Sequence, residues 1–158
     1  MTNNSQKYEL KILSQTENLE IVRDFVATIA SKSGFGIDDV NKIELAVDEA
    51  CANVIKHAYQ NQNSQNKIHL IVQLEFDKIT VIIADEGKGF DIHKIKDLNL
   101  DEYIAEMRVG GLGIHLMKNL MDEVKFERIA SKRNEVRMIK YYSTPNGALV
   151  NTNEQTSN

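Results

Sequence analysis

The sequence has only one cysteine, Cys51, among its 158 residues. A single cysteine cannot form an internal disulfide, which favours an intracellular setting. With one cysteine and four scattered histidines, a structural zinc site is not expected. The simplest interpretation of Cys51 is therefore a small residue of the hydrophobic core.

Other absences exclude further classes of protein. No apolar run is long enough to span a bilayer, and the N-terminal stretch MTNNSQKYEL has no apolar signal region. The net charge of −4 gives no electrostatic basis for general nucleic-acid binding. The Walker loop, the dinucleotide fingerprint, the nucleophile elbow, the zinc-protease helix and the kinase HRD/DFG pair are all missing. We therefore expect a cytoplasmic protein with neither a membrane nor a nucleic acid as a direct partner.

What is present has the composition of one globular domain. Hydrophobic residues make up 42% and charged residues 27% of the chain, as in folded proteins rather than disordered ones. We see no internal repeat and no linker, so one domain is expected over 7–142. The polar segments 1–6 and 143–158 are expected to be disordered termini.

The hydrophobic pattern predicts the order β-α-α-β-β-loop-α-β-β. Because hairpins dominate the strand connections, the fold class is predicted as α+β, with a mixed, mainly antiparallel sheet in a two-layer α/β sandwich. Phe76 is expected on the same strand face as Ile68, Leu70, Val72 and Leu74, just before a tight turn at Asp77 and Lys78. The strands are expected at 7–13, 67–76, 79–84, 124–130 and 134–142.

Three helices are predicted from their periodicity and end signals. The first follows a capping-box spacing at Ser14 and closes at Gly34. The second begins with Asp38 or Asp39 as its cap and runs to about Tyr59. The third covers 113–122, and residues 91–109 form a long loop that can hold a short helix.

The second helix carries polar groups beside its apolar stripe. At about 100° per residue, its core stripe is Ile43, Val47, Ala50, Val54 and Ala58. Glu49, Asn53 and His57 share one flank of that stripe with Ala46, whereas Glu44, Asp48 and Ala52 lie on the far, solvated face. Polar groups at such a rim can line a cleft, although a solvated helix edge explains them equally well. His57 is interpreted as a structural residue.

Two glycine-rich segments follow. In "DEGKGFD", Asp85 stands where a strand ends, and Gly87 and Gly89 allow a ligand close to the backbone. In "GGLG", residues 110–113, the glycines open a helix, whose free N–H groups suit a phosphate. Either segment alone is also typical of an ordinary turn or hinge.

The ordered set is more specific than its parts. The set consists of a helical E-x-x-x-N, then a strand that ends in D-x-G-x-G, and about twenty residues later a G-x-G that opens a helix. This order resembles the Bergerat fold, the nucleotide-binding domain shared by gyrase, heat-shock chaperones, MutL-type repair proteins and sensor histidine kinases. Within it, "DEACANVIKHAY" and "GGLGIHLMKNLMDEV" are most similar to the anti-sigma-factor serine/threonine kinases. The resemblance covers about residues 7–142. Only about 37 residues precede the long helix, so no upstream dimerisation helix with a phosphorylatable histidine is expected, which argues against a sensor kinase.

The resemblance implies roles for individual residues. Asn53 would hold Mg²⁺ at the nucleotide phosphates, Glu49 would be the general base, and Asp85 would accept the adenine amino hydrogen. The resemblance also implies that 91–109 is an ATP lid, but the lid has no run of threonine and serine. Asp48 stands where many relatives have serine. Further nucleotide contacts would come from Gly87, Gly89, Gly111, Leu112 and Gly113, and from Arg108 in preference to Lys88, Lys94 or Lys96.

The resemblance also implies a function. The protein would be an ATP- and Mg²⁺-dependent protein serine/threonine kinase that phosphorylates a small anti-anti-sigma antagonist of the STAS type. As a homodimer, the same domain would sequester a sigma factor until the antagonist displaces it. Two alternatives stay open: an ATP-binding partner-switch module with little or no kinase activity, and an ATPase of the repair or chaperone type, which would need additional domains.

Overall fold

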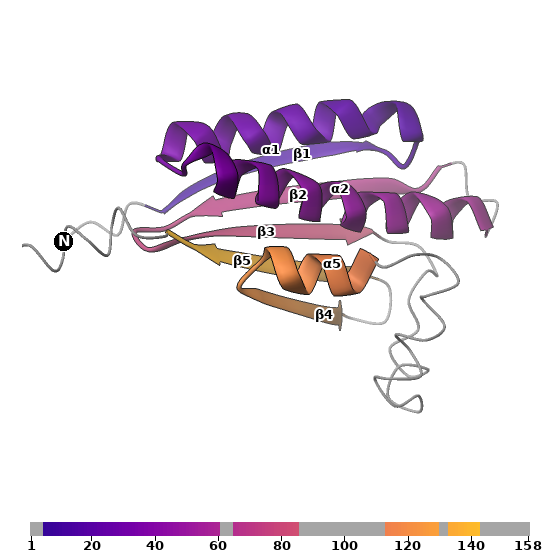
Figure 1. Ribbon diagram of the computed structural model, residues 1–158. Helices are drawn as coiled ribbons and strands as arrows, with labels where there is room; N and C mark the ends of the chain where they lie inside the picture. The colour runs from indigo at the N-terminus through magenta and orange to yellow at the C-terminus, as the bar shows by residue number, and fades with distance from the viewer. Residues whose placement is uncertain (1–4, 61–64, 86–112, 130–132, 143–158) are drawn as a thin grey trace, which may run out of the picture.

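The computed structural model describes residues 5–60, 65–85, 113–129 and 133–142 (Figure 1). The side chains of 57–60 and 128 lie outside the described part. The elements are β1 (Gln6–Leu13), the 3₁₀ turn η1 (Thr16–Asn18), α1 (Leu19–Ser33), α2 (Ile37–Gln60), β2 (Lys67–Leu74), β3 (Lys78–Asp85), α5 (Gly113–Leu120), β4 (Glu123–Ile129) and β5 (Arg133–Tyr141). This order matches the predicted one, with boundaries shifted by a few residues.

The five strands form one sheet in the order β1-β2-β3-β5-β4. Every pairing between neighbouring strands is antiparallel. The helices α1, α2 and α5 all lie on the same side of this sheet (Figure 1). The predicted α+β class and two-layer sandwich are thereby confirmed.

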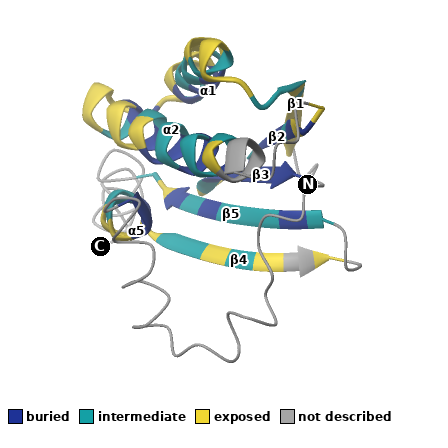
Figure 2. Cartoon of the chain, turned by 90° about the vertical axis from the view of Figure 1, so that its right-hand side faces the viewer, coloured by how far each residue is buried: buried dark blue, intermediate teal, exposed yellow. Residues whose placement is uncertain are grey.

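The core lies between the helices and one face of the sheet, as the dark blue inner surfaces in Figure 2 show. Branched residues dominate the central strands, where they suit a pleated, packed surface. Alternate residues of β2 and β3 are directly paired there, for example Val72 with Val81 and Leu70 with Ile83. All four of these side chains are buried.

The apolar stripe of α2 packs onto this face. Ile43, Val47, Ala50 and Val54 are buried as predicted, while the side chain of Ala58 lies outside the described residues. Cys51 is fully buried, which confirms its interpretation as a core residue. Burial also raises the pKa of its thiol, because the thiolate would lose its hydration.

The helix ends differ in part from the prediction. The stop at Gly34 is confirmed: its φ is 107°, in the left-handed region that glycine tolerates. The capping box at Ser14 is wrong, because the Ser14 hydroxyl accepts a hydrogen bond from Asn66 Nδ2 at 2.7 Å. Helix α1 instead begins after η1.

The cap of α2 was also predicted two or three residues too late. The carbonyl of Gly36 accepts the Val40 N–H at 2.9 Å, so the first helical hydrogen bond begins at Gly36. Asp38 and Asp39 therefore lie within the first turn. Their carboxylates still suit the positive end of the helix dipole.

Two side chains lie where the pattern did not put them. Phe76 is 90% exposed in the turn between β2 and β3, so its predicted place on the inner face is wrong. The turn begins one residue early, because Glu75 N–H donates to the Lys78 carbonyl. Asp48 was predicted on a solvated face, but it accepts a hydrogen bond from Arg23 of α1 at 2.8 Å. Periodicity places Asp48 opposite the sheet and cannot reveal that α1 packs beside it.

Candidate functional site

The polar flank of α2 lies beside the start of α5. Glu49 and Asn53 are one helical turn apart and are both half-buried. Such partial exposure is what a side chain at the rim of a cleft requires, because it must reach both the protein and a ligand. The same flank continues to His57, whose side chain lies outside the described residues.

Gly113 is in close contact with this flank. A Cβ atom at Gly113 would lie 3.1 Å from Glu49 Oε2 and 3.4 Å from Asn53 Nδ2. Distances of this size leave no comfortable room for a methyl group, so glycine lets α5 approach the two side chains. The structure thus brings together three residues that the sequence analysis singled out on separate segments.

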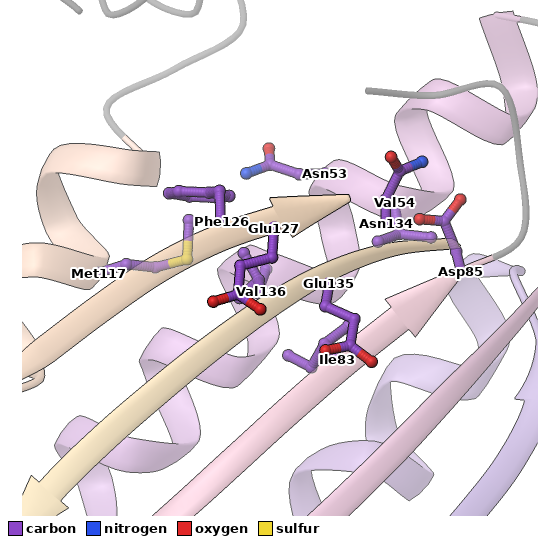
Figure 3. A pocket seen from close by; sticks show the side chains of 11 residues that line it. Asn53, Val54, Ile83, Asp85, Met117, Phe126, Glu127, Asn134, Glu135 and Val136 are labelled. Atoms are coloured by element: carbon purple, nitrogen blue, oxygen red, sulfur yellow. The ribbon is translucent and has the colours of Figure 1, made fainter. Parts of the chain in front are cut away.

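Asp85 is the last residue of β3 and is only 5% exposed. Asp85 and Asn53 contribute to the same pocket, between α2, α5 and the sheet (Figure 3). The apolar walls of this pocket come from Ile83, Met117, Phe126 and Val136, among others. A pocket with apolar walls and a few convergent polar groups is the usual form of a small-molecule site.

Asn134 is a pocket residue that the sequence analysis missed. It pairs directly with Asp85 between β3 and β5 and is 4% exposed. Figure 3 shows the two side chains together at the same end of the sheet. Each takes part in further interactions within the protein. A signal did exist, because Asn134 shares the inner-face alternation of Val136 and Met138.

Successive side chains of β4 and β5 near the pocket point to opposite faces of the sheet. Phe126 and Val136 are directly paired on the inner face. Glu127 and Glu135 are paired on the opposite face. Glu135 forms an ion pair with Arg133 at 3.0 Å. The inner wall beside Asp85 and Asn134 is therefore apolar.

The remaining predicted site residues lie outside the described part of the chain. They are Gly87, Gly89, Arg108, Gly111 and Leu112, together with the lid 91–109 and its lysines Lys88, Lys94 and Lys96. Of the predicted nucleotide contacts, the structure therefore places Glu49, Asn53, Asp85 and Gly113.

The donor atoms of this site fit a hard cation better than a soft one. Asn53 supplies an amide oxygen, and oxygen atoms are the ligands that Mg²⁺ prefers. Within the described ranges there is no group of three or more His, Cys, Asp or Glu side chains that could hold a metal alone. In nucleotide sites, phosphate and water oxygens supply most of the ligands of Mg²⁺.

Comparison with known proteins agrees with this geometry. The model of the histidine kinase-like ATPase domain matches residues 12–140. The chain belongs to this family. Serine-protein kinase RsbW of Bacillus subtilis (strain 168) is 34% identical over 146 residues, which cover 89% of each chain. RsbW of Bacillus velezensis is 36% identical over 138 residues, with 84% of each chain covered.

A solved structure shows the same fold. The RsbU and RsbW domains of Rv1364c from Mycobacterium tuberculosis match with a TM-score of 0.61 and 14% identity. The match covers 85% of this chain, which spans about a third (32%) of that structure. At this identity the likeness supports the fold alone.

Membership in the histidine kinase-like ATPase family implies that the chain uses ATP. Its similarity to the RsbW proteins places it among the serine-protein kinases of this family. The predicted kinase is thus supported over the ATP-binding module without activity. Among the described residues no helix is long and apolar enough to cross a membrane.

Proposed function

We propose that the pocket between α2, α5 and the sheet binds ATP with its adenine against β3 and β5. The buried Asp85 carboxylate is an acceptor for the adenine amino group, whereas guanine presents a carbonyl at the matching edge. The Asn134 amide beside it offers both donors and an acceptor. Phe126 and Val136 supply the apolar wall for the ring.

The phosphates then extend toward Glu49, Asn53 and Gly113. The observation that supports this direction most is the contact of Gly113 with both α2 side chains. Asn53 would hold Mg²⁺, which neutralises phosphate charge when bound. The start of α5 adds backbone N–H groups and the positive end of its dipole. Gly87, Gly89, Arg108, Gly111 and Leu112 remain proposed contacts.

Glu49 is the proposed general base. It would accept the proton of an attacking serine hydroxyl, or orient that hydroxyl toward the terminal phosphate. The serine oxygen bonds to the terminal phosphorus as the bond to the bridging oxygen breaks, and ADP leaves. Catalysis then depends on positioning and charge neutralisation, as in phosphoryl transfer generally.

The proposed substrate is a small STAS-type anti-anti-sigma antagonist, and the proposed second partner is a sigma factor held by a homodimer of this chain in the cytoplasm. Similarity to the RsbW proteins supports this assignment. The antagonist would release the sigma factor, and phosphorylation of the antagonist would restore the inhibition.

The test is transfer of γ-labelled phosphate from ATP to a candidate STAS-type antagonist protein. Glu49→Gln should lower the rate about a hundredfold or more, with ATP affinity changed less than about twofold. Glu44→Gln, on the same helix and also half-buried, is the matched control and should keep the wild-type rate. Equal transfer by wild type and Glu49→Gln would exclude Glu49 as the base. No transfer by the wild type would favour the ATP-binding module.

A further inference from the structure

The face of the sheet that points away from the helices, here called the back face, carries a chain of polar contacts across four strands. His69 of β2 lies between Glu9 of β1 and Arg133 of β5. Glu9 Oε2 is 2.9 Å from His69 Nε2, and Arg133 Nη2 is 3.0 Å from His69 Nδ1. Arg133 Nε also donates to Glu135 Oε1 at 3.0 Å.

Ala84 of β3 lies beneath the contact between Arg133 and His69. It stands between His69 and Glu135 in the register of β2, β3 and β5, and it is 1% exposed. Its short side chain allows the Arg133 side chain to cross β3 to His69. Ala84 directly precedes Asp85, which lines the pocket. The contact of Arg133 with His69, here called the clamp, therefore lies on the back face behind the polar end of the pocket.

The same clamp fixes the start of β5. Arg133 and Glu135 flank Asn134, which points to the opposite face and pairs with Asp85. On the back face, Arg133 is thus hydrogen-bonded both to Glu135 of the same strand and to His69 of β2. These hydrogen bonds limit how far Asn134 can move away from Asp85.

The two contacts of His69 fit one tautomer of the neutral ring. A guanidinium group can only donate hydrogen bonds, so Nδ1 of His69 must be the acceptor. The ring proton is then on Nε2 and is donated to Glu9. Protonation of the ring would place an N–H opposite Arg133, where two donors and two positive charges would face each other.

We propose that Arg133 is a positioning residue of the nucleotide pocket and that its hydrogen bond to His69 depends on pH. Neutral His69 holds Arg133, and Arg133 keeps Asn134 against Asp85. Protonated His69 releases Arg133, so nucleotide affinity falls as the pH falls. This inference rests on the proposed binding of adenine at Asp85 and Asn134.

Charged groups of both signs surround His69. Glu9 places a negative charge and Arg133 a positive charge beside the ring. Lys11 lies directly across on β1, and Lys67 is two residues away on the same face of β2; both are positive. Glu135 adds a negative charge beyond Arg133. Histidine side chains in general change charge between about pH 5 and 8, so the test covers that range.

The experiment is calorimetric titration of the full chain with ATP and Mg²⁺ between about pH 5.5 and 8. Wild-type affinity should fall about threefold to tenfold more toward low pH than that of His69→Asn, the loss expected for one hydrogen bond. Asparagine keeps an acceptor near the Nδ1 position and does not titrate. Because both proteins bind the same nucleotide, titration of the phosphates cancels in the comparison.

Arg133→Gln tests the clamp itself. It should bind ATP about threefold to tenfold more weakly at neutral pH and should follow the pH profile of His69→Asn. Lys125→Gln removes an equal charge from the same face, on the exposed part of β4, and should behave as wild type. Thermal unfolding at each pH shows whether every variant is folded.

Two results would overturn the inference while leaving the proposed function intact. One is a wild-type profile identical to that of His69→Asn, and the other is wild-type affinity for Arg133→Gln. If Arg133→Gln does not fold, the comparison of the wild-type pH profile with that of His69→Asn still decides the inference. If folded wild-type protein binds no ATP at any pH, the proposed function and the inference both fail.

Discussion

The carboxylate of Glu49 lies against the first residue of α5, so closely that a methyl group on Gly113 would be 3.1 Å from Glu49 Oε2. This contact joins two segments more than sixty residues apart in the sequence. It also restricts the carboxylate to one side of the helix start. A residue proposed to handle a proton during phosphoryl transfer needs such a fixed position.

Gly113→Ala should therefore damage the reaction more than the fold. The new Cβ would displace the Glu49 carboxylate and crowd the Asn53 amide, and we expect phosphoryl transfer to fall about tenfold or more. Initial rates at saturating ATP provide the measurement. Gly36→Ala is the matched control, because it also precedes a helix and a Cβ there meets nothing within 4 Å. Unchanged transfer in Gly113→Ala would contradict the proposed position of Glu49.

Asp85→Asn should weaken the preference for adenine. The substitution turns one acceptor oxygen of a buried carboxylate into a donor group, so the adenine amino group would meet a competing N–H. We expect ATP affinity to fall about tenfold to a hundredfold, while GTP affinity changes much less. Competition binding with both nucleotides measures the ratio. The control is Asp77→Asn, in the exposed turn before β3, which should keep the wild-type ratio of ATP to GTP affinity. An unchanged ratio in Asp85→Asn would argue against this carboxylate as the adenine acceptor.

Lys140→Met should lower the stability of the fold. Lys140 Nζ donates to the Leu120 carbonyl at 2.9 Å and lies 3.9 Å from Asp39 Oδ1, with its side chain 9% exposed. It therefore ties the end of α5 and the start of α2 to β5. Removing the ammonium leaves a helix-end carbonyl without this partner, at a cost of about 1–3 kcal/mol. Urea unfolding measures the change, and Lys125→Met on exposed β4 should cost much less. Equal stability of the two variants would show that the buried ammonium adds little.

Cys51 should resist thiol reagents in the native protein. Its side chain is 0% exposed, and burial raises the pKa of the thiol, so the reactive thiolate is scarce at neutral pH. Labelling by a disulfide reagent should be complete in denaturant and should need local opening of α2 otherwise. Because Cys51 lies between Glu49 and Asn53 on α2, bound ATP should slow this labelling further. Rapid labelling of the folded protein would show that α2 opens readily.

Much of the fold was predictable because its signals are local. The stripe from Ile43 to Val54 and the left-handed stop at Gly34 depend on residues within a turn or two of each other. Two of the errors came from contacts with distant segments. Ser14 is bonded to Asn66, and Asp48 is bonded to Arg23 of the neighbouring helix. Neither partner is visible in the periodicity of one segment.

The candidate site shows the same division. Glu49, Asn53, Asp85 and Gly113 were singled out from short motifs. The structure places Asn53 and Asp85 in one pocket, and Gly113 against both Glu49 and Asn53. Asn134 was missed, because the alternation along β5 indicates its inner face but not its pairing with Asp85. That pairing follows from β5 lying next to β3, while β4 takes the edge of the sheet.

The sequence by itself determined the type and order of the elements, the apolar stripe of α2 and the inability of Cys51 to form an internal disulfide. These depend on local geometry and on simple counting. Only the tertiary structure decided that Gly113 lies against Glu49, that Asn134 pairs with Asp85 and that Arg133 reaches His69 across β3. Such contacts are fixed by strand order and register, which result from packing the whole chain at once.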